Sequence, residues 1–356
     1  MRLKRFSSIE DKKEYIKLVY IGFSFKHHGL HSGYDCIKDG LGYTKIIDCQ
    51  KSYDILQRIS GSKDFFSRQY VKFLGFRLWW IEFKYIPLAI FSRNTIFHFI
   101  YAENTYRYFG YFLNKTNRLV CTYHQTIDFY INNPKYLIGI KKIDKIIVMR
   151  RDLVASFKAL SGNPNVYYIP HGVDADYFKP AIKEKKNLNI LMVGDWLRDF
   201  GVANEVFKLI LVERNDIKIN VVCNPSHFKY FDKNIRLNLM SGIKDEELLV
   251  LYQQAHLLFL PLKGFTANNS ILEGGVCGCK ILIATNQQTD SLYLGTEYVE
   301  ILPLNIDRII EKIISILDDV QKYNWNNQVK YISSNYSWRK IKQQTYELLT
   351  NPYNFI

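Results

Sequence analysis

The sequence predicts an α/β protein of two domains, each a parallel sheet with helices on its faces. Three observations carry this expectation: a length of 356 residues, short β-rich runs that alternate with helix-length segments, and one interruption of that alternation near mid-chain. With 47% hydrophobic and 23% charged residues, the composition is that of a globular protein, which excludes disorder and a small disulfide scaffold. The length suits two domains of about 170 to 180 residues.

The first half of the chain has the pattern of a parallel sheet with connecting helices. A strand is predicted at Lys17–Phe23, and it runs into a loop rich in glycine and histidine, SFKHHGLHSGYD. Further strands are predicted at Thr95–Tyr101, Leu119–Tyr123 and Lys145–Met149, because each run is short and rich in β-branched or aromatic residues. Strands that alternate with helices favour parallel pairing.

The alternation stops at Ile169–Pro180, and the charged segment AIKEKKN that follows is the best candidate for an interdomain linker. The alternation of predicted strands and helices then restarts in the second half of the chain. The predicted strands are Asn189–Val193, Lys218–Val222, His256–Leu260 and Lys280–Ala284. The predicted helices are Val202–Glu213, Asp245–Gln254, Ser270–Cys277, Asp307–Leu317 and Trp338–Leu349.

The positive charge is concentrated in the first half of the chain. Residues 1–180 hold 28 Lys and Arg against 15 Asp and Glu, whereas residues 181–356 hold 20 against 19. Of the net charge of +14, the first half therefore carries +13. This asymmetry indicates an anionic partner, and the classes are nucleic acid, an acidic membrane surface or an anionic substrate.

The cysteine spacing and the apolar runs of the sequence indicate the cellular compartment in which we expect the protein. The six cysteines are scattered without the paired spacing of zinc sites, which fits a reducing cytoplasm. No run of about 18 apolar residues occurs and no apolar run follows the charged first residues, so we expect neither a transmembrane span nor a signal peptide. We expect the protein to stay in the compartment where it is made.

Ligands of open α/β sheets bind outside the carboxyl ends of the strands, so residues at strand exits are the functional candidates. Two facing domains of this kind would hold a ligand between them. The candidate regions are the Gly22–Asp35 loop, His124, the Gly194–Gly201 loop and the Lys263–Glu273 loop.

A series of strings, in matching order along nearly the whole chain, resembles the retaining GT-B glycosyltransferases of family four. YIPHGVDADYFKP (Tyr168–Pro180) is similar to the interdomain signature of that family. Two strings resemble its donor-binding region: Gly242–Leu262 (GIKDEELLVLYQQAHLLFLPL) and Asn268–Thr285 (NNSILEGGVCGCKILIAT). Three more match its acceptor-domain loops and C-terminal helix: His31–Asp35 (HSGYD), Thr122–Gln125 (TYHQ) and Tyr336–Ile341 (YSWRKI).

The resemblance implies two Rossmann-like domains that face a central cleft. Residues 1–180 would form the acceptor-binding domain, 181–335 the nucleotide-sugar donor domain, and 336–356 a helix packing back on the first domain. The implied activity is transfer of a hexose-type sugar, with retention, to a hydroxyl of a glycan or lipid-linked acceptor in bacterial surface polysaccharide synthesis, such as capsule, O-antigen or lipopolysaccharide. The implied mechanism is front-side attack assisted by the leaving diphosphate, which requires no protein nucleophile.

The resemblance assigns donor-binding roles to the start of the last predicted Rossmann helix. Glu273 would accept hydrogen bonds from the ribose hydroxyls, since a carboxylate suits a diol. The alternative is an acidic residue that complements a helix N-terminus. The amides of Asn269, Ser270 and Ile271 would hold the diphosphate or the sugar.

The sequence departs from the family at three charged positions. Phe265 stands where the family usually has a second glutamate, and Asn268 and Asn269 are the candidate substitutes. Asp195 and Phe200 stand where an arginine and a lysine usually meet the diphosphate, after Gly194. Arg198 is the remaining cation of that loop and would stabilise the leaving group, with Lys263 as a second cation; a salt bridge from Arg198 to Asp195 or Asp199 is the alternative.

The acceptor side offers His124, at a position that in the family lies beside the donor sugar; a surface histidine at a strand end is the alternative. The loop with His27, His28, Gly29, Ser32 and Gly33 would approach the phosphates or the acceptor, because glycine permits close contact. These histidines have no carboxylate spacing for a metal, and the D-x-D at Asp174–Asp176 belongs to the interdomain signature. We expect no metal and no cofactor beyond the nucleotide-sugar.

The segment Lys63–Phe91 is the densest mixture of cations and aromatic residues. Its aromatic side chains fall on one side of a helical wheel, and the list is Phe66, Tyr70, Phe73, Phe76, Trp80 and Phe83. Arg68 and Lys72 lie away from that side, but Arg77 and Lys84 do not. The segment suits peripheral binding to the anionic inner face of the cytoplasmic membrane, and a helix packed on the sheet is the alternative.

Three rival functions remain beside the glycosyltransferase. Nucleic-acid binding requires a recognisable module, and the sequence contains none. A catalytically silent GT-B protein that binds a glycan or a protein partner is motivated by Phe265, Asp195 and Phe200 at positions where charge is expected. An epimerase or phosphorylase on the same fold has no positive support in the sequence.

Overall fold

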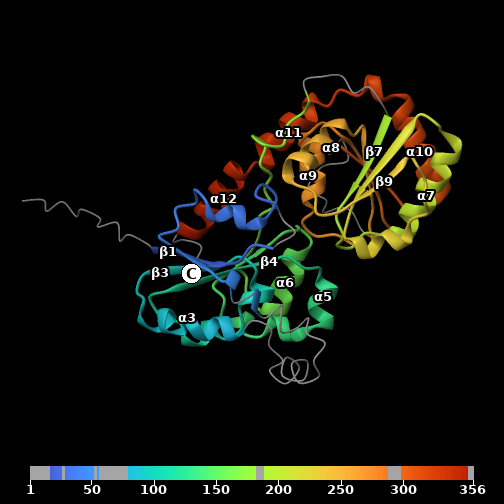
Figure 1. The fold of residues 1–356 in the computed structure, drawn as a ribbon. Helices are drawn as coiled ribbons and strands as arrows, with labels where there is room; N and C mark the ends of the chain where they lie inside the picture. The colour runs from blue at the N-terminus through green and yellow to red at the C-terminus, as the bar shows by residue number, and fades with distance from the viewer. Residues whose placement is uncertain are drawn as a thin grey trace, which may run out of the picture.

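The computed structural model describes residues 17–25, 29–51, 54–55, 79–181, 188–287 and 298–351. The described strands form two separate six-stranded sheets, one from each half of the chain, and every pairing between named strands is parallel. Figure 1 shows the two sheets as two lobes joined by the chain and by the helices at its end. The predicted α/β class with two sheets is confirmed.

The first sheet has the strand order β2-β1-β3-β4-β5-β6. Its strands are β1 (Lys17–Gly22), β2 (Lys45–Asp48), β3 (Thr95–Phe99), β4 (Arg118–Tyr123), β5 (Lys145–Val148) and β6 (Val166–Tyr168). The order changes direction between β1 and β3, because the chain builds β2 on one side of β1 and all later strands on the other. The loops after β1 and β3 therefore leave the sheet at its topological switch point.

The second sheet has the strand order β12-β11-β10-β7-β8-β9. Its strands are β7 (Leu188–Val193), β8 (Ile217–Val222), β9 (Leu237–Met240), β10 (Leu257–Pro261), β11 (Lys280–Ala284) and β12 (Val299–Leu302). Numbered within this sheet, the order is 3-2-1-4-5-6, that of a Rossmann fold. Its switch point lies between β7 and β10.

Helices connect the strands and cover both faces of each sheet. The α-helices are α3 (Trp79–Phe91), α4 (Ala102–Thr105), α5 (Ile127–Asn132), α6 (Leu153–Ser161), α7 (Phe200–Glu213), α8 (Asp245–Gln254), α9 (Asn269–Val276), α10 (Ile306–Asp318), α11 (Asn326–Tyr336) and α12 (Trp338–Thr350). The 3-10 helices are η1 (Tyr34–Lys38), η2 (Phe109–Phe112), η3 (Pro134–Leu137), η4 (Ile140–Lys142), η5 (Pro225–Tyr230) and η6 (Val320–Lys322).

The central strands were predicted to within two residues, but the four outer strands were not predicted. β2 and β6 are the edges of the first sheet, and β9 and β12 are the edges of the second. Each edge strand is three or four residues long and is at most partly buried. An edge strand with exposed faces has no continuous apolar run, so periodicity does not reveal it. Helix α11 was also missed.

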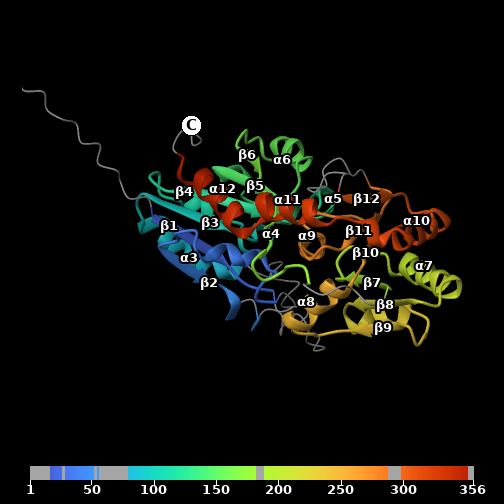
Figure 2. The ribbon, with the colours of Figure 1, turned by 90° about the horizontal axis from the view of Figure 1, so that it is seen from above.

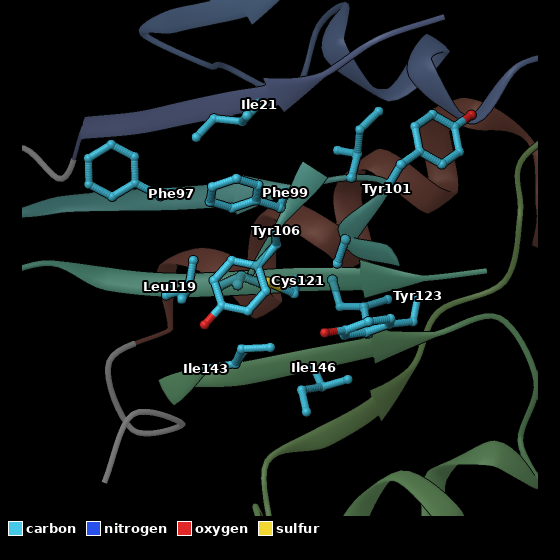
Figure 3. Packing of buried hydrophobic residues seen from close by; sticks show 14 of the residues in the cluster. Ile21, Phe97, Phe99, Tyr101, Tyr106, Leu119, Cys121, Tyr123, Ile143 and Ile146 are labelled. Atoms are coloured by element: carbon cyan, nitrogen blue, oxygen red, sulfur yellow. The ribbon is translucent and has the colours of Figure 1, made fainter. Parts of the chain in front are cut away.

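The core of the first domain packs on both faces of its sheet. Figure 3 shows Phe97 and Phe99 of β3 beside Leu119 and Cys121 of β4, in a cluster that also takes in Ile21. The second sheet has one cluster against α8, α9 and α11, and another against α7 and α10. Strands buried on both faces explain the near-continuous apolar runs from which they were predicted.

Helix α12 lies on the first domain although it ends the described chain. Trp338, Ile341, Leu348 and Leu349 belong to the buried cluster of the first sheet. Figure 1 shows α12 on one side of that sheet and α3 on the other, and the view from above in Figure 2 agrees. The buried Lys145 Nζ donates to the carbonyl of Leu348 at 2.5 Å, satisfying an orphan carbonyl of the last turn. The predicted return of the C-terminal helix is confirmed.

The expected domain boundaries at 180 and 335 remain predictions, since residues 182–187 lie outside the described part of the chain. A parallel bridge joins Val173 to Ser337, where the chain enters and leaves the second domain. Among the described residues no helix is both long and apolar enough to span a membrane. All six cysteines are free thiols.

The basic and aromatic segment is described only at its end. Residues 63–78 lie outside the described ranges, so the predicted interfacial helix and its cations Arg68, Lys72 and Arg77 stay predictions. Within α3, Phe83, Ile90 and Phe91 are exposed. Glu82 is buried and accepts hydrogen bonds from the backbone N–H groups of Tyr108 and Phe109, which ties α3 to the loop before η2.

The position of α12 predicts that its buried face stabilises the first domain. We expect Ile341→Ala to lower the free energy of unfolding by about 2–5 kcal/mol, because a fully buried isoleucine leaves a cavity. Arg339→Ala, at an exposed position of the same helix, should change it by less than about 0.5 kcal/mol. Urea unfolding followed by circular dichroism measures both. Equal stability of the two variants would contradict the packing.

Candidate functional site

The loops after β7 and β10 meet at the switch point of the second sheet. Lys263 N–H donates to Leu197 O at 2.9 Å, and Arg198 and Leu262 form an antiparallel bridge. Gly194 follows β7 with a φ of +100°, a conformation that favours glycine. A Cβ at Gly194 would lie 3.0 Å from an Arg198 guanidinium nitrogen, so the glycine lets that side chain fold back over the strand end.

Arg198 is anchored at the start of α9. Its guanidinium donates to Val193 O at 2.8 Å, and the same nitrogen lies 3.2 Å from Asn268 Oδ1 and 3.0 Å from Ser270 Oγ. The alternative partners have other roles: Asp195 accepts from Asn224 N–H at 2.6 Å, and Asp199 caps α7. The predicted cation therefore lies beside the predicted helix N-terminus.

Among the other predicted residues around α9, Ile271 and Asn268 make hydrogen bonds within the helix start, whereas the Lys263 side chain is exposed. Ile271 N–H donates to Asn268 O at 3.2 Å, so this predicted amide already has a partner within the turn. Asn268 Oδ1 also accepts from Ser270 Oγ at 2.6 Å. Lys263 is 62% exposed and lies 4.0 Å from Asp199, so it is a surface cation near the same loop.

Glu273 is buried on α9, 4% exposed. Its Oε2 accepts from the Tyr252 hydroxyl at 2.9 Å, whereas its Oε1 has no hydrogen-bond partner among the described residues. Burial raises the pKa of Glu273 to about 7, against the hydroxyls of Ser32 and Tyr252, which lower it. Ser32 Oγ, which is close enough to this carboxylate to lower its pKa, is also buried and has no other hydrogen-bond partner among the described residues.

The predicted glycine loop of the first domain contacts the second domain. Asn269 Nδ2 donates to Ser32 O, and Leu30 N–H donates to Asp245 Oδ2 at 2.8 Å. A Cβ at Gly29 would overlap the Asp245 carboxylate, so this glycine permits the close approach that was expected of the loop. Gly33 precedes η1 with an ordinary φ of −84°. His27 and His28 lie outside the described residues.

His124 follows β4 and is nearly buried, with 11% of its side chain exposed. Its Nδ1 lies 3.5 Å from Glu103 Oε1, and its ring packs against Tyr34 and Tyr101 at centroid distances of 4.8 and 4.6 Å. The alternative of a surface histidine is therefore wrong, and the proposed role of His124 stays a prediction. Tyr34 lies in the predicted Gly22–Asp35 loop, but Tyr101 and Glu103 were missed, although Tyr101 ends a predicted strand and Glu103 comes two residues later, where the strand-exit rule would have found them.

Phe265 and Phe200, which stand at positions where the family has charged residues, are both packed against other side chains: Phe265 against Arg150 and Phe200 against His227. Phe265 is 3% exposed, and the Arg150 guanidinium lies 4.4 Å from its ring centroid and donates to its carbonyl at 2.6 Å. Phe200 is 6% exposed and stacks on His227 at 4.2 Å. Arg150 comes from the first domain, so the contact with Phe265 links the two domains and was not predicted.

No group of three or more His, Cys, Asp or Glu with metal-binding proximity occurs within the described ranges. No family model matches the chain, and no curated protein matches its sequence.

Solved structures show a shared fold. Anabaena HepE, in complex with UDP and glucose, is similar over 95% of this chain and 100% of its own, with a TM-score of 0.68 and 13% identity. A glycosyltransferase from Rickettsia africae covers 94% and 99%, with a TM-score of 0.60 and 15% identity. A variant of S. aureus TarM in complex with fondaparinux, α-GlcNAc-glycerol and UDP covers 76% of this chain and 58% of its own, at a TM-score of 0.61 and 13% identity.

These identities establish the architecture alone. The chain has the GT-B fold, with two parallel α/β domains whose switch-point loops contact each other through Ser32 and Asn269. The predicted residues Glu273, Arg198, Asn268, Asn269 and Ser270 lie together around one helix start. His124 lies with Tyr34 at the strand exits of the first domain.

The raised pKa of Glu273 predicts a pH-dependent stability. The folded protein holds a proton on Glu273 up to about pH 7, whereas the unfolded chain releases it near the ordinary pKa of 4.5. The free energy of unfolding therefore falls as the pH rises from about 4.5 to 7. Across that interval we expect the wild type to lose on the order of 3 kcal/mol relative to Glu273→Gln.

Urea unfolding at pH 5 and pH 8 measures this difference. Glu246→Gln, which changes an exposed carboxylate of the same domain, is the matched control and should follow the wild type at both pH values. Parallel pH dependence of the wild type and Glu273→Gln would show that the buried carboxyl is not the group that titrates.

Proposed function

We propose that the protein is a glycosyltransferase that moves a sugar from a nucleotide-sugar to a hydroxyl of a glycan or lipid-linked acceptor. One observation carries the proposal: Glu273, a buried carboxylate with one oxygen unpaired among the described residues, lies one turn into α9, and the first residues of the same helix contact Arg198 and the first domain. Support comes from two similar structures, because HepE is in complex with UDP and glucose and TarM with UDP and α-GlcNAc-glycerol.

The donor would lie at the switch point of the second sheet. The free Oε1 of Glu273 would accept from a ribose hydroxyl, since a ligand hydroxyl supplies the hydrogen bond that the folded chain leaves unmade. Arg198, with the amides of Asn269 and Ser270, would face the diphosphate at the helix N-terminus. Gly194 would give the phosphates access to the strand end, and Lys263 would add a surface cation.

The acceptor would approach from the first domain, past His124 and the loop at Gly29, Ser32 and Gly33. Retention by front-side attack needs no enzyme nucleophile, and we propose that the leaving diphosphate takes the acceptor proton. Arg198 would stabilise the negative charge that develops on it. We also propose that the reaction requires no metal ion and serves bacterial surface polysaccharide synthesis.

A panel of UDP-, GDP-, ADP- and CMP-linked sugars tests the donor site by thermal shift. A ligand at about 100 times its dissociation constant adds about 2.7 kcal/mol to the folded state, so a true donor raises the melting temperature visibly. We expect one nucleotide class to bind, Glu273→Ala to abolish the shift, and Glu246→Ala to leave it unchanged. Nucleotide release should then follow and should persist in EDTA.

The outcomes separate the rival functions. Absence of a shift with every nucleotide contradicts the donor site and favours a silent GT-B protein that binds a glycan or a protein. A shift without nucleotide release under any acceptor mixture also favours a protein that binds but does not transfer, as Asp195, Phe200 and Phe265 suggested. If EDTA abolishes nucleotide release, only the proposal that the reaction requires no metal ion is contradicted.

We further propose that the protein works at the inner face of the cytoplasmic membrane. The support is the +13 charge of residues 1–180 and the exposed Phe83, Ile90 and Phe91 of α3, which form the end of the basic aromatic segment Lys63–Phe91. Cations near an anionic surface contribute about 1 kcal/mol each, and exposed aromatic residues enter the interface.

Vesicles containing phosphatidylglycerol test the membrane proposal by co-sedimentation. Charge reversal at four cations of the segment should abolish binding, and these are Lys63, Arg68, Lys72 and Arg77. The matched control reverses four exposed lysines of the second domain and should retain binding: Lys208, Lys218, Lys229 and Lys233. Equal binding of both variants would show that the segment is not the membrane contact.

A further inference from the structure

One loop of the second domain is held by the first domain at three points. This loop follows β10 and leads into α9. Arg150 Nη1 donates to Phe265 O at 2.6 Å. Two residues further on, Ala267 packs against the buried cluster of the first sheet, and after two more residues Asn269 Nδ2 donates to Ser32 O. Alternate residues of the loop therefore contact the first domain.

The neighbouring residues of the same stretch contact the second domain instead. Asn268 Oδ1 and Ser270 Oγ lie 3.2 and 3.0 Å from a guanidinium nitrogen of Arg198. One short stretch of chain thus joins the first domain to the predicted phosphate-binding cation. Because Glu273 lies one turn further along α9, a displacement of the loop would disturb all of the proposed donor-binding groups at once.

Arg150 is fixed within the first domain before it meets this loop. It lies two residues after β5, at the carboxyl edge of the first sheet, and its side chain is only 12% exposed. Its Nε and Nη2 donate to the two carboxylate oxygens of Asp152 at 2.9 and 2.6 Å, a two-point contact that fixes the plane of the guanidinium. The guanidinium carbon lies 4.4 Å from the centroid of the Phe265 ring.

The hydrogen bonds of Arg150 indicate an indirect role in ligand binding. All three nitrogens of its guanidinium donate to protein groups, two of them to Asp152 and the third to the Phe265 carbonyl. The carboxylate of Asp152 also neutralises the positive charge that a phosphate would require. The side chain is therefore directed at the loop, which it holds by both a ring and a carbonyl.

We propose that Arg150 is a positioning residue for the nucleotide-sugar site: by holding Phe265 from the first domain, it fixes the loop between β10 and α9 in its binding position. The proposal rests on the proposed function and deepens it, because it makes the first domain part of the donor site. Without this contact, the loop spends a smaller fraction of its time in the binding position. The apparent dissociation constant of the nucleotide then rises in inverse proportion to that fraction.

Hydrogen exchange of the full-length protein without nucleotide tests the contact itself. In Arg150→Gln the amides of residues 262–272 should exchange at least about fivefold faster, because a charge-assisted hydrogen bond that closes the loop is lost. The amides of β7 should exchange as in the wild type, which separates a local effect from a general loss of stability.

Arg151→Gln is the matched control for this experiment. It makes the same change of charge at the next residue, which is exposed and whose guanidinium lies over the ring of Tyr168 in its own domain. Exchange of residues 262–272 should therefore stay at the wild-type rate. Thermal melting verifies that Arg150→Gln is folded. If it is not, Arg150→Lys replaces it and should show a smaller increase, since it keeps the charge but loses the two-point contact with Asp152.

Calorimetric titration with nucleoside diphosphates and monophosphates of uridine, guanosine, adenosine and cytidine tests the effect on the site. We expect Arg150→Gln to weaken binding of the preferred nucleotide at least about fivefold, and Arg150→Lys to recover part of the loss. The factor should be the same for the diphosphate and the monophosphate, because positioning changes the competent fraction of the loop and not the contacts of the phosphates. Arg151→Gln should bind as the wild type does.

Three results would overturn the proposal: unchanged exchange of residues 262–272 in Arg150→Gln, unchanged nucleotide affinity in that variant, or a loss of affinity confined to the diphosphate. The last result would show that Arg150 contacts a phosphate directly. If no nucleotide binds the wild type, the proposed function fails and the donor role of the loop fails with it. Wild-type nucleotide binding by folded Arg150→Gln contradicts the positioning role alone and leaves the proposed function intact.

Discussion

The candidate site depends on one topological constraint, which acts in both sheets. In each sheet the chain builds strands on the two sides of its first strand, so the loops after two neighbouring parallel strands diverge at the carboxyl edge. At β7 and β10 this brings Arg198 to the start of α9, and at β1 and β3 it brings Tyr34 to Tyr101. Because Asn269 bonds to the backbone of Ser32, the two switch points meet.

Two buried carboxylates near this junction destabilise the folded state, because each has an oxygen without a hydrogen-bond partner in the described part of the chain. Glu273 and Glu103 are both buried, and each has a carboxylate oxygen without a hydrogen-bond partner among the described residues. The raised pKa of Glu273 expresses the cost of ionising it there. Packing elsewhere is continuous, and the buried face of α12 adds to it. Both carboxylates lie on helices that follow strand ends, where ligands of open α/β sheets bind.

The sequence predicted the parts of this structure that depend on local pattern. Central strands such as Thr95–Phe99 are buried on both faces and appear as apolar runs, whereas the edge strand Lys45–Asp48 is mostly exposed and gives no such run. His124 and the loop that ends at Glu273 were found because they follow predicted strands, and strings that resemble a family supplied their expected roles. Arg150 was missed because its contact with Phe265 joins residues 115 positions apart, and no local pattern encodes such a pair.

The three departures from the family pattern have related physical consequences. Asp195 and Phe200 remove two expected cations from the phosphate loop, and Phe265 removes an expected carboxylate from the facing loop. Compared with the family pattern, the two loops therefore lack two positive charges and one negative charge. Asp195 adds one further negative charge. Arg198, fixed by Val193, Asn268 and Ser270, then becomes the cation nearest the start of α9. In the proposed donor site, a diphosphate would therefore depend mainly on this guanidinium and the helix N-terminus, with Lys263 as a more distant surface cation, so Arg198 would matter more here than in a site with several cations.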